Sequence, residues 1–235
     1  MKQLLKIPFT VLAALVSVSA QAQHFIGVTG GLSIPSGNFT KTDYADSKSG
    51  FASGGGNIGV TGTYFLTKHF GINGLVSYQG YGFKGAQDLA DGYKEDFEID
   101  SATVLIKGRN YGINVLVGPY YALPVARNFF IDARVLVGIT SAHLAGNEVY
   151  IEDQSDGTFA QQAASAAAFG LQAGLAARYN LSRHFGIMLH GDYFSSKPNF
   201  TVSNTNRANE AGRVLTGYNQ PISGINLNLS LVYLF

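Results

Sequence analysis

The sequence has no cysteine, so an exported form of this chain must hold its fold without disulfide bonds. It also has no run of ~18 consecutive apolar residues, which a membrane-spanning helix needs. Charged residues are few and nearly balanced, with 16 basic and 15 acidic side chains among 235 residues, which argues against a nucleic-acid partner. These absences exclude a helical membrane protein and a disulfide-bonded scaffold.

The N-terminal segment begins with Lys2 and Lys6 and continues as a short apolar run that ends near Ala20. A basic start, a short apolar core and small residues before a cleavage point are typical of a secretory signal peptide. With Ala20 and Ala22 at the minus-three and minus-one positions, we expect cleavage after Ala22. The prediction is a signal peptide at residues 1–22 and one mature domain at residues 23–235.

The mature chain is rich in glycine, tyrosine and phenylalanine, a composition typical of β-proteins with many turns. Apolar and polar residues alternate with period two in runs of roughly ten residues, which is the pattern of strands. We expect eight strands, at His24–Pro35, Gly55–Leu66, Phe70–Tyr81, Arg109–Leu123, Phe129–Thr140, Ala167–Leu181, Phe185–Ser195 and Ser223–Phe235. The alanine-rich stretch that contains the sixth run has a composition that favours a helix. Its large apolar residues nevertheless keep one parity, so we interpret it as a strand.

The connections between these strands alternate strictly between short and long. Three are short turns, at residues 67–69, 124–128 and 182–184, and the other four are long and rich in Gly, Ser, Asn and Asp. All of the 15 acidic residues except Asp132 and Asp192 lie in the long connections, whereas Lys68, Arg127 and Arg183 lie in the short turns. Such alternation indicates antiparallel neighbours whose two ends face different environments.

The two faces of the expected strands differ in an unusual way. One face is apolar, and the other carries Asn, Thr, Ser and Gln but neither Lys nor Glu. A soluble barrel would present a dense Lys and Glu surface to water, so an uncharged polar face suits an enclosed interior. The apolar face would then meet lipid, and a closed barrel is the β-structure that satisfies its backbone in a bilayer. The sequence therefore predicts an all-β fold, an eight-stranded antiparallel transmembrane β-barrel with up-and-down meander topology; a soluble β-protein is the alternative.

A nine-residue segment, YFLTKHFGI, returns later as YNLSRHFGI, and a looser copy, YALPVARNFFI, lies between them. Each copy places one aromatic residue on the apolar face on either side of a short turn. This pattern predicts an aromatic girdle at one membrane–water interface. Its expected members are Tyr64, Phe70, Tyr121, Phe129, Tyr179, Phe185 and Tyr233. The ten residues from Tyr111 to Tyr121 would span roughly 34 Å along a strand, or about 26 Å when tilted, close to the apolar height of such barrels.

From "HFIGVTGGLSIPSGNF" to "INLNLSLVYLF", the mature chain resembles the small outer-membrane β-barrel proteins of Gram-negative bacteria, the OmpX-like barrels of the porin family, and is similar to the OmpA transmembrane domain. The resemblance implies an integral protein of the outer membrane with its long loops at the cell surface. It also implies an assembly signal in the last strand, read by the outer-membrane insertion machinery. The residues matching that signal are Ile225, Leu227, Leu229, Leu231, Tyr233 and Phe235. Pro119 departs from the pattern, because it cannot donate to a ladder that has no free edge, and we expect a bulge or local break there.

The four charges expected inside the barrel are Asp132, Arg134, Arg178 and Asp192. Enclosed charges are costly unless paired, so these residues are expected to form a network. If Arg134 is coupled to Asp132, removing both should cost less than the sum of the single losses. An eight-stranded interior is just wide enough for side chains to fill, which favours a structural role for the network over an ion path.

Three functions remain open at this stage. The first is a non-enzymatic barrel with a structural or surface-interaction role carried by its long loops. The second is a narrow channel for small or apolar solutes, and the third is a lipid A-modifying outer-membrane enzyme. His190 and Asp192 share the inner face, but no serine has a position that suggests a catalytic cluster. We expect no cofactor, no metal site and a monomer whose partners are outer-membrane lipid, lipopolysaccharide and the assembly machinery.

Overall fold

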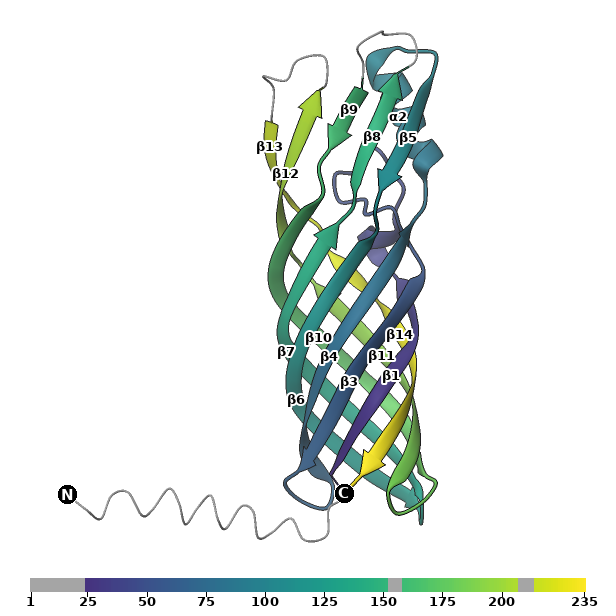
Figure 1. Cartoon of the computed structure of the whole chain (residues 1–235), viewed down its shortest axis with the longest axis vertical. Helices are drawn as coiled ribbons and strands as arrows, with labels where there is room; N and C mark the ends of the chain where they lie inside the picture. The colour runs from purple at the N-terminus through teal and green to yellow at the C-terminus, as the bar shows by residue number, and fades with distance from the viewer. Residues whose placement is uncertain (1–23, 152–157, 207–213) are drawn as a thin grey trace, which may run out of the picture.

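A computed structural model describes residues 24–151, 158–206 and 214–235 (Figure 1). Within these residues, one sheet has the neighbour order β2-β4-β3-β1-β14-β11-β10-β7-β6, and β4 also pairs with β6, so that the sheet closes into a barrel. β2 (Ala52–Ser53) is a two-residue addition beside β4, and the remaining eight strands form the wall. These are β1 (Phe25–Pro35), β3 (Gly55–Phe65), β4 (Phe70–Phe83), β6 (Asn110–Ala126), β7 (Phe129–Leu144), β10 (Ala164–Asn180), β11 (Phe185–Ser196) and β14 (Ile222–Leu234).

The eight-stranded antiparallel meander predicted from the sequence is confirmed. Each wall strand pairs with the next wall strand along the chain, and β14 returns to pair with β1 from Phe25 opposite Leu234 to Pro35 opposite Gly224. The alanine-rich segment is the strand β10, as its parity predicts. The predicted signal peptide at residues 1–22 lies outside the described residues.

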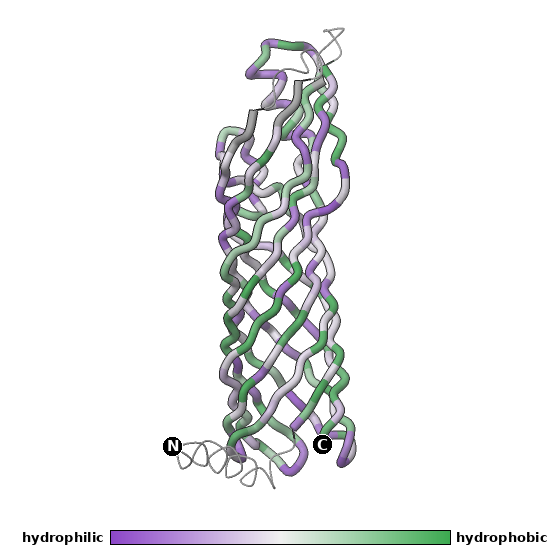
Figure 2. Tube along the Cα trace, turned by 60° about the vertical axis from the view of Figure 1, so that its left-hand side comes forward, coloured by the Kyte–Doolittle hydropathy of each residue, from purple (hydrophilic) through white to green (hydrophobic). Residues whose placement is uncertain are grey.

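Along the wall strands, exposed and buried residues alternate with period two. Unlike in a soluble protein, the large apolar residues are exposed and the small polar residues are buried. In β14, Leu229 is 61% exposed whereas Ser230 is 1% exposed. Figure 2 shows hydrophobic residues recurring along the barrel strands. Exposed Leu, Ile and Val around the wall form an apolar belt that suits contact with lipid, while the small polar residues face inward.

The barrel has two unlike ends. We call the end with the three short turns the turn end and the opposite end the loop end. At the loop end the structure corrects the sequence-based interpretation of four loops, because most of those connections continue as regular structure above the barrel (Figure 1). Five strands form a second sheet of order β13-β12-β9-β8-β5. They are β5 (Ala102–Lys107), β8 (Gly146–Ile151), β9 (Thr158–Gln161), β12 (Asn199–Asn206) and β13 (Val214–Asn219).

The second sheet forms because several strands of the wall continue, after a break of one or two residues, as strands above the barrel. A single residue, Ala145, separates β7 from β8, and two residues separate β11 from β12 and β13 from β14. The first two long connections add a short 3-10 helix, η1 (Gly37–Thr40), and a helix, α2 (Ala86–Phe97). Among the residues that the structure describes, no helix is long and apolar enough to cross a membrane.

Pro119 interrupts the ladder locally, as expected. β6 pairs with β7 through Val117 opposite Val137 and Tyr120 opposite Arg134, with no pairs between them at Gly118 and Pro119. The register is the same on both sides of this gap, so the missing N–H of Pro119 costs ladder bonds without inserting a residue. The register shift of this strand pair lies elsewhere, between Pro124 and Ala126 at the turn end.

Two of the three short turns are held by a side-chain hydroxyl at the same position. Thr67 Oγ1 accepts hydrogen bonds from the backbone N–H groups of His69 and Phe70, at 3.4 and 3.0 Å. Ser182 Oγ does the same for His184 and Phe185, at 3.2 and 3.1 Å. The hydroxyl satisfies two amides that the hairpin leaves without ladder partners. The Thr-to-Ser exchange between the two copies therefore keeps the group on which the turn depends.

The turns also fasten each hairpin to the next strand. The carbonyl of His69 accepts from Ala122 N at 2.7 Å, that of Asn128 from Asn180 N at 2.9 Å, and that of His184 from Leu234 N at 2.8 Å. The carbonyl of His24 accepts from Phe235 N at 2.8 Å. These bonds extend the ladder around the rim past the last residue of the strands. The repetition of the turn is thus a consequence of closing one rim with similar hairpins.

Replacing Thr67 or Ser182 with Ala should destabilise the barrel by about 1 kcal/mol each, because two turn amides lose their acceptor. Urea unfolding of the protein in phospholipid vesicles would measure the difference. Thr67→Ser is the matched control and should retain most of the stability. Equal stability of Thr67→Ala and wild type would show that the hydroxyl does not hold the turn.

Candidate functional sites inside the barrel and at its loop end

The barrel interior is filled by two apolar clusters. The turn-end cluster consists of Phe25, Phe65, Tyr120, Ala122, Ala176, Met188, Val232 and Leu234, with Phe130 packed against it. The loop-end cluster includes Phe39, Leu75, Tyr81, Leu116, Leu136, Leu144, Phe194, Phe200 and Ile222. Side chains of buried Asn, Thr, Ser and Gln and the four predicted charges occupy further positions on the inner wall. The interior is therefore a packed core, as an eight-stranded circumference requires.

Arg134 of β7 and Asp192 of β11 form a bidentate ion pair across the intervening strand β10. Arg134 Nε and Nη2 donate to the two Asp192 carboxylate oxygens at 2.9 and 2.7 Å. Both residues lie opposite Gly174, and a Cβ on that glycine would clash with Asp192 Oδ1. The missing side chain at Gly174 is thus what lets the two charges meet. Their side chains are 5% and 0% exposed, so the pairing compensates a large desolvation cost.

The other two charges form a separate pair nearer the turn end. Arg178 Nε donates to Asp132 Oδ2 at 2.8 Å, and the Tyr120 hydroxyl donates to the same oxygen at 2.6 Å. The Arg178 guanidinium carbon lies 4.3 Å from the centre of the Phe130 ring and 5.5 Å from that of Phe25. The charge is therefore held between a carboxylate and two aromatic rings of the turn-end cluster.

The structure places all four predicted charges on the inner wall and divides the expected network into two ion pairs. Arg134 pairs with Asp192, and Asp132 pairs with Arg178. The double variant of Arg134 and Asp132 that was considered from the sequence would therefore remove one residue from each of two different ion pairs. Strand parity places all four side chains inward, but the pairing depends on the register of β7, β10 and β11.

His190 contacts Ser230, a serine that sequence reasoning missed. Arg134 Nη2 lies 2.9 Å from His190 Nδ1, and a guanidinium can only donate, so Nδ1 is the acceptor and Nε2 carries the proton. His190 Nε2 then donates to Ser230 Oγ. A serine nucleophile needs the reverse arrangement, in which the imidazole accepts from the hydroxyl and a carboxylate orients its other nitrogen. The alternation of the last strand places Ser230 inward, but only the register shows its contact.

The other four histidines contact tyrosine rings near the ends of the wall, three of them stacked and His69 tilted. At the turn end, the ring of His24 lies 4.3 Å from that of Tyr64, His69 lies 6.2 Å from Tyr121, and His184 lies 5.8 Å from Tyr233. Toward the loop end, His143 stacks on Tyr111 at 4.6 Å. These histidines support aromatic rings at the positions where Tyr is enriched in membrane proteins.

The residues predicted for the girdle surround the turn end on the outer face. Across neighbouring strands they stand opposite one another as Phe70–Tyr121, Phe129–Tyr179 and Phe185–Tyr233, and Tyr64 lies beside them. The residues matching the assembly signal, Ile225, Leu227, Leu229, Leu231, Tyr233 and Phe235, are all exposed on the outer face of β14 and just after it. The structure gives these side chains a surface on which lipid or an assembly factor could act.

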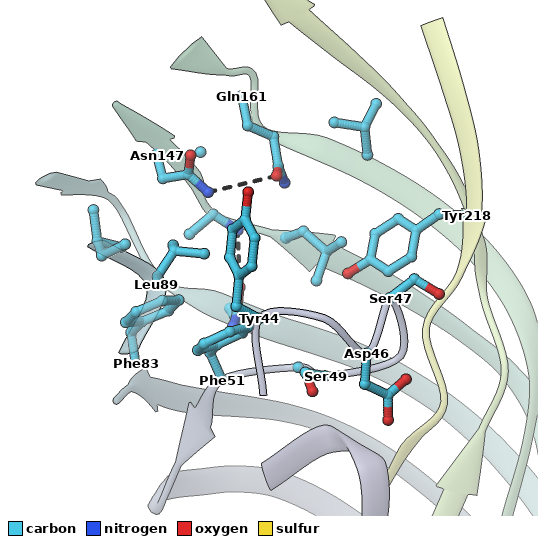
Figure 3. Close-up of a pocket in the computed structure, with 17 residues that line it drawn as sticks. Tyr44, Asp46, Ser47, Ser49, Phe51, Phe83, Leu89, Asn147, Gln161 and Tyr218 are labelled. Carbon is cyan, nitrogen blue, oxygen red and sulfur yellow. Dashed lines mark hydrogen bonds between the residues drawn. The ribbon is translucent and has the colours of Figure 1, made fainter. Parts of the chain in front are cut away.

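A cavity of about 280 Å³ lies above the barrel at the loop end (Figure 3). Its wall comes from both long connections of the first half of the chain and from the second sheet. Apolar side chains in this wall are Phe51, Phe83, Leu89, Ile106, Leu144 and Val202. Tyr44 and Tyr218 add aromatic rings, and Ser49, Asn147 and Gln161 add polar groups. Leu144 and Val202 also belong to the loop-end cluster, which therefore borders the cavity.

Tyr44 connects the first long connection to α2 beside this cavity. Its hydroxyl donates to Asp96 Oδ2 at 2.6 Å, and its ring lies 5.2 Å from that of Tyr93. A Cβ at Gly92 would clash with the Tyr44 ring, so α2 can approach only because residue 92 is glycine. Burial, followed by the bond to Asp96, raises the pKa of Tyr44 well above its usual value. The phenol therefore remains a donor at any physiological pH.

Two features of the cavity wall are costly for the folded chain. Ser49 is 7% exposed and its Oγ has no hydrogen-bond partner, which costs about 1–3 kcal/mol for a buried hydroxyl. Phe51 has a φ of 49°, a left-handed conformation that is strained for a bulky side chain by roughly 1–2 kcal/mol. Unsatisfied groups and strained backbone concentrate at functional sites. Sequence reasoning missed this site, although the aromatic residues within the long connections were a visible signal.

Asp46 is the one acidic residue among the described residues of the cavity wall, and it is already compensated. The backbone N–H of Lys48 and the Lys41 ammonium bond to its carboxylate at 3.0 and 3.1 Å, and they lower the pKa of Asp46. Burial raises the pKa of the Tyr218 hydroxyl to about 12, so it too stays neutral. Across residues 24–151, 158–206 and 214–235, no group of three or more His, Cys, Asp or Glu side chains could hold a metal ion.

The family model described as outer membrane protein beta-barrel domain matches residues 9–235. None of the curated proteins matches the sequence. The outer membrane protease OmpT from Escherichia coli has a similar structure, with 10% identity over 92% of this chain and 98% of that chain and a TM-score of 0.53. A major outer membrane protein from Thermus thermophilus is similar at 15% identity, over 91% of this chain and 100% of that chain, with a TM-score of 0.50. At these identities the likeness concerns the fold alone.

The ion pairs of the interior can be tested by two double-variant cycles. Arg134→Met alone should destabilise the barrel by about 3–5 kcal/mol, because it leaves the Asp192 carboxylate buried without its partner. Adding Asp192→Asn should recover part of this loss, so that the coupling energy from urea unfolding in vesicles is large. The matched cycle of Arg134 with Asp132 should give a clearly smaller coupling. A coupling for Arg134 with Asp132 as large as for Arg134 with Asp192 would contradict the observed pairing.

Proposed function

The chain belongs to the outer membrane protein beta-barrel domain family and is an integral outer-membrane barrel, and on this premise we propose that it is a non-enzymatic protein that acts through its loop end at the cell surface. The observation that carries this proposal is the contrast between its two parts. The bore is a packed core, whereas the long connections build a second sheet, a helix and a cavity above it.

A narrow channel is the weaker alternative. Any solute crossing the barrel would have to pass the loop-end cluster, the buried ion pairs and the turn-end cluster. Fully buried Leu136, Phe194 and Tyr120 lie in these layers at 0–2% exposure. Moving them would break close packing and expose charges whose pairing depends on it. Packing therefore favours a structural bore over a conducting one.

An outer-membrane enzyme, the other alternative, is also less well supported than the proposed function. The inner His190 donates to Ser230 rather than activating it, and the other histidines support tyrosines of the wall. OmpT is a protease, but its likeness to this chain is one of fold and assigns no residue a catalytic role. The residues at the loop end offer binding surfaces instead of an activated nucleophile.

The orientation that we propose places the turn end in the periplasm and the loop end outside the cell. Short turns on the periplasmic side and longer extracellular connections are the rule for bacterial barrels. The charges agree with this assignment, because the basic residues Lys68, Arg127 and Arg183 mark the turn end and the acidic residues concentrate at the loop end. The apolar belt makes outer-membrane lipid the immediate partner, with lipopolysaccharide beside the loop end. We propose that the assembly machinery binds the last strand and that the mature protein is a monomer.

Single-cysteine variants test the orientation, and the chain has no cysteine of its own that would also react with the label. Cysteine in place of Asp91, which is exposed on α2, should react with a membrane-impermeant maleimide on intact cells. Cysteine in place of Lys68 or Arg183 should react only after the outer membrane is permeabilised. Labelling at Lys68 but not at Asp91 on intact cells would reverse the proposed orientation and remove the basis for a cell-surface role.

A further inference from the structure

The loop-end cavity is a half-open hollow that is large enough to act as a binding site of its own. We propose that it binds a small uncharged amphipathic molecule, one with a ring-shaped or branched apolar body and at least one hydrogen-bonding group. This inference does not depend on which side of the membrane the loop end faces. It concerns what the cavity can hold, whereas the proposed function concerns where the protein acts.

The shape of the site indicates binding rather than passage. Leu144 of β7 and Val202 of β12 line the cavity and also belong to the loop-end cluster, so the cavity borders the packed core of the barrel. α2 and the first long connection complete the wall on the side that the second sheet leaves open. A solute that enters from the loop end therefore meets a packed core and remains in the cavity. Pockets that hold small molecules are largely preformed in this way.

The wall is held in place before any ligand arrives. Gln220 is 0% exposed, and its amide nitrogen donates to the carbonyl of Lys48 at 3.1 Å, which fixes the chain beside Ser49. Phe51 N donates to the carbonyl of Lys41 at 3.0 Å, and the Phe51 ring stacks on that of Phe83 at 5.6 Å. These contacts keep Phe51 in its strained conformation at the cavity. Preorganisation of this kind lowers the entropic cost of binding.

The chemistry of the wall selects the class of ligand. Among the described residues that line the cavity, none is Lys, Arg or His, so an anion would find no counter-charge. The carboxylate of Asp46 already bonds to Lys41 and to the backbone of Lys48, so a cation would have to compete with them. Aromatic and aliphatic side chains dominate the remaining surface and favour an apolar body.

The polar groups that a ligand can reach are two side-chain amides of the second sheet. The Ser49 hydroxyl makes no hydrogen bond within the described part of the protein, but it is buried behind the lining and points away from the cavity (Figure 3). Asn147 and Gln161 stand across the cavity and contact each other only at 3.5 Å, the limit of a hydrogen bond (Figure 3). A ligand hydroxyl or carbonyl would give Asn147 and Gln161 a closer partner, which a purely apolar molecule would not provide. An apolar body with one polar group therefore complements the wall better than a hydrocarbon or an ion.

Fluorine NMR on the full barrel in lipid nanodiscs tests this proposal with 4-fluorobenzyl alcohol as the probe. Its signal should show saturable binding beyond the partitioning measured with empty nanodiscs. Ala145→Phe adds a ring to the cavity wall and should weaken binding at least tenfold, while Ala126→Phe, the same change at the turn end, should leave it unchanged. Gln161→Leu, a change of similar size, should weaken binding about threefold to tenfold, as expected for one lost hydrogen bond.

Two further probes separate the possible ligand classes. 4-Fluorotoluene lacks the hydroxyl and should bind more weakly than the alcohol, and Gln161→Leu should not weaken its binding. 4-Fluorobenzoate carries a charge and should bind more weakly still. Partitioning without saturation, equal binding to the Ala145→Phe variant, or tighter binding of the toluene or the benzoate would each overturn the proposal. Far-UV circular dichroism of every variant checks that the barrel is folded, and the surface-labelling experiment remains independent of all these outcomes.

Discussion

The structure depends on one constraint, the closure of eight strands around an interior that side chains must fill. Closure gives each wall strand a partner on both sides within the bilayer, where water cannot satisfy the backbone, and the β6–β7 ladder is interrupted only locally at Pro119. It also leaves a narrow space in which a missing side chain would create a void and an unpaired charge would be costly. The apolar clusters at the two ends and the ion pairs Arg134–Asp192 and Arg178–Asp132 meet both demands.

The same constraint explains where glycine is needed inside. Arg134 and Asp192 belong to strands separated by β10, and their side chains meet because Gly174 leaves the space between them empty. At the rim, closure requires hairpins that bond to the next strand, and the Thr67 and Ser182 turns provide them with similar sequences. The histidines of these turns, His69 and His184, also contact the rings of Tyr121 and Tyr233 at the membrane edge. The repeated segment therefore serves rim closure and interface anchoring together.

Much of the wall could be predicted from the sequence because period two alone assigns each side chain to one face. This is why β10 could be recognised as a strand against its helix-favouring composition, and why all four charges could be placed inside. The partner of Arg134 could not be predicted, because it depends on the register of three strands. The interruption at Pro119 followed from its missing N–H, whereas the bulge near Pro124 depends on how the hairpin closes. The cavity depends on tertiary contacts such as Tyr44 with Asp96 and Gln220 with Lys48, which have no local periodicity.

A filled bore separates the membrane part of this protein, which is scaffold, from the loop end, where binding groups and strain are concentrated. That separation is the central claim, and conductance measures it directly. Purified barrel reconstituted into a planar bilayer should give no stable open state, because the ion pairs and the two clusters leave no route for ions. Reproducible single-channel currents that disappear when Gly174 is replaced by a bulky residue would contradict the account and identify the interior as a pore.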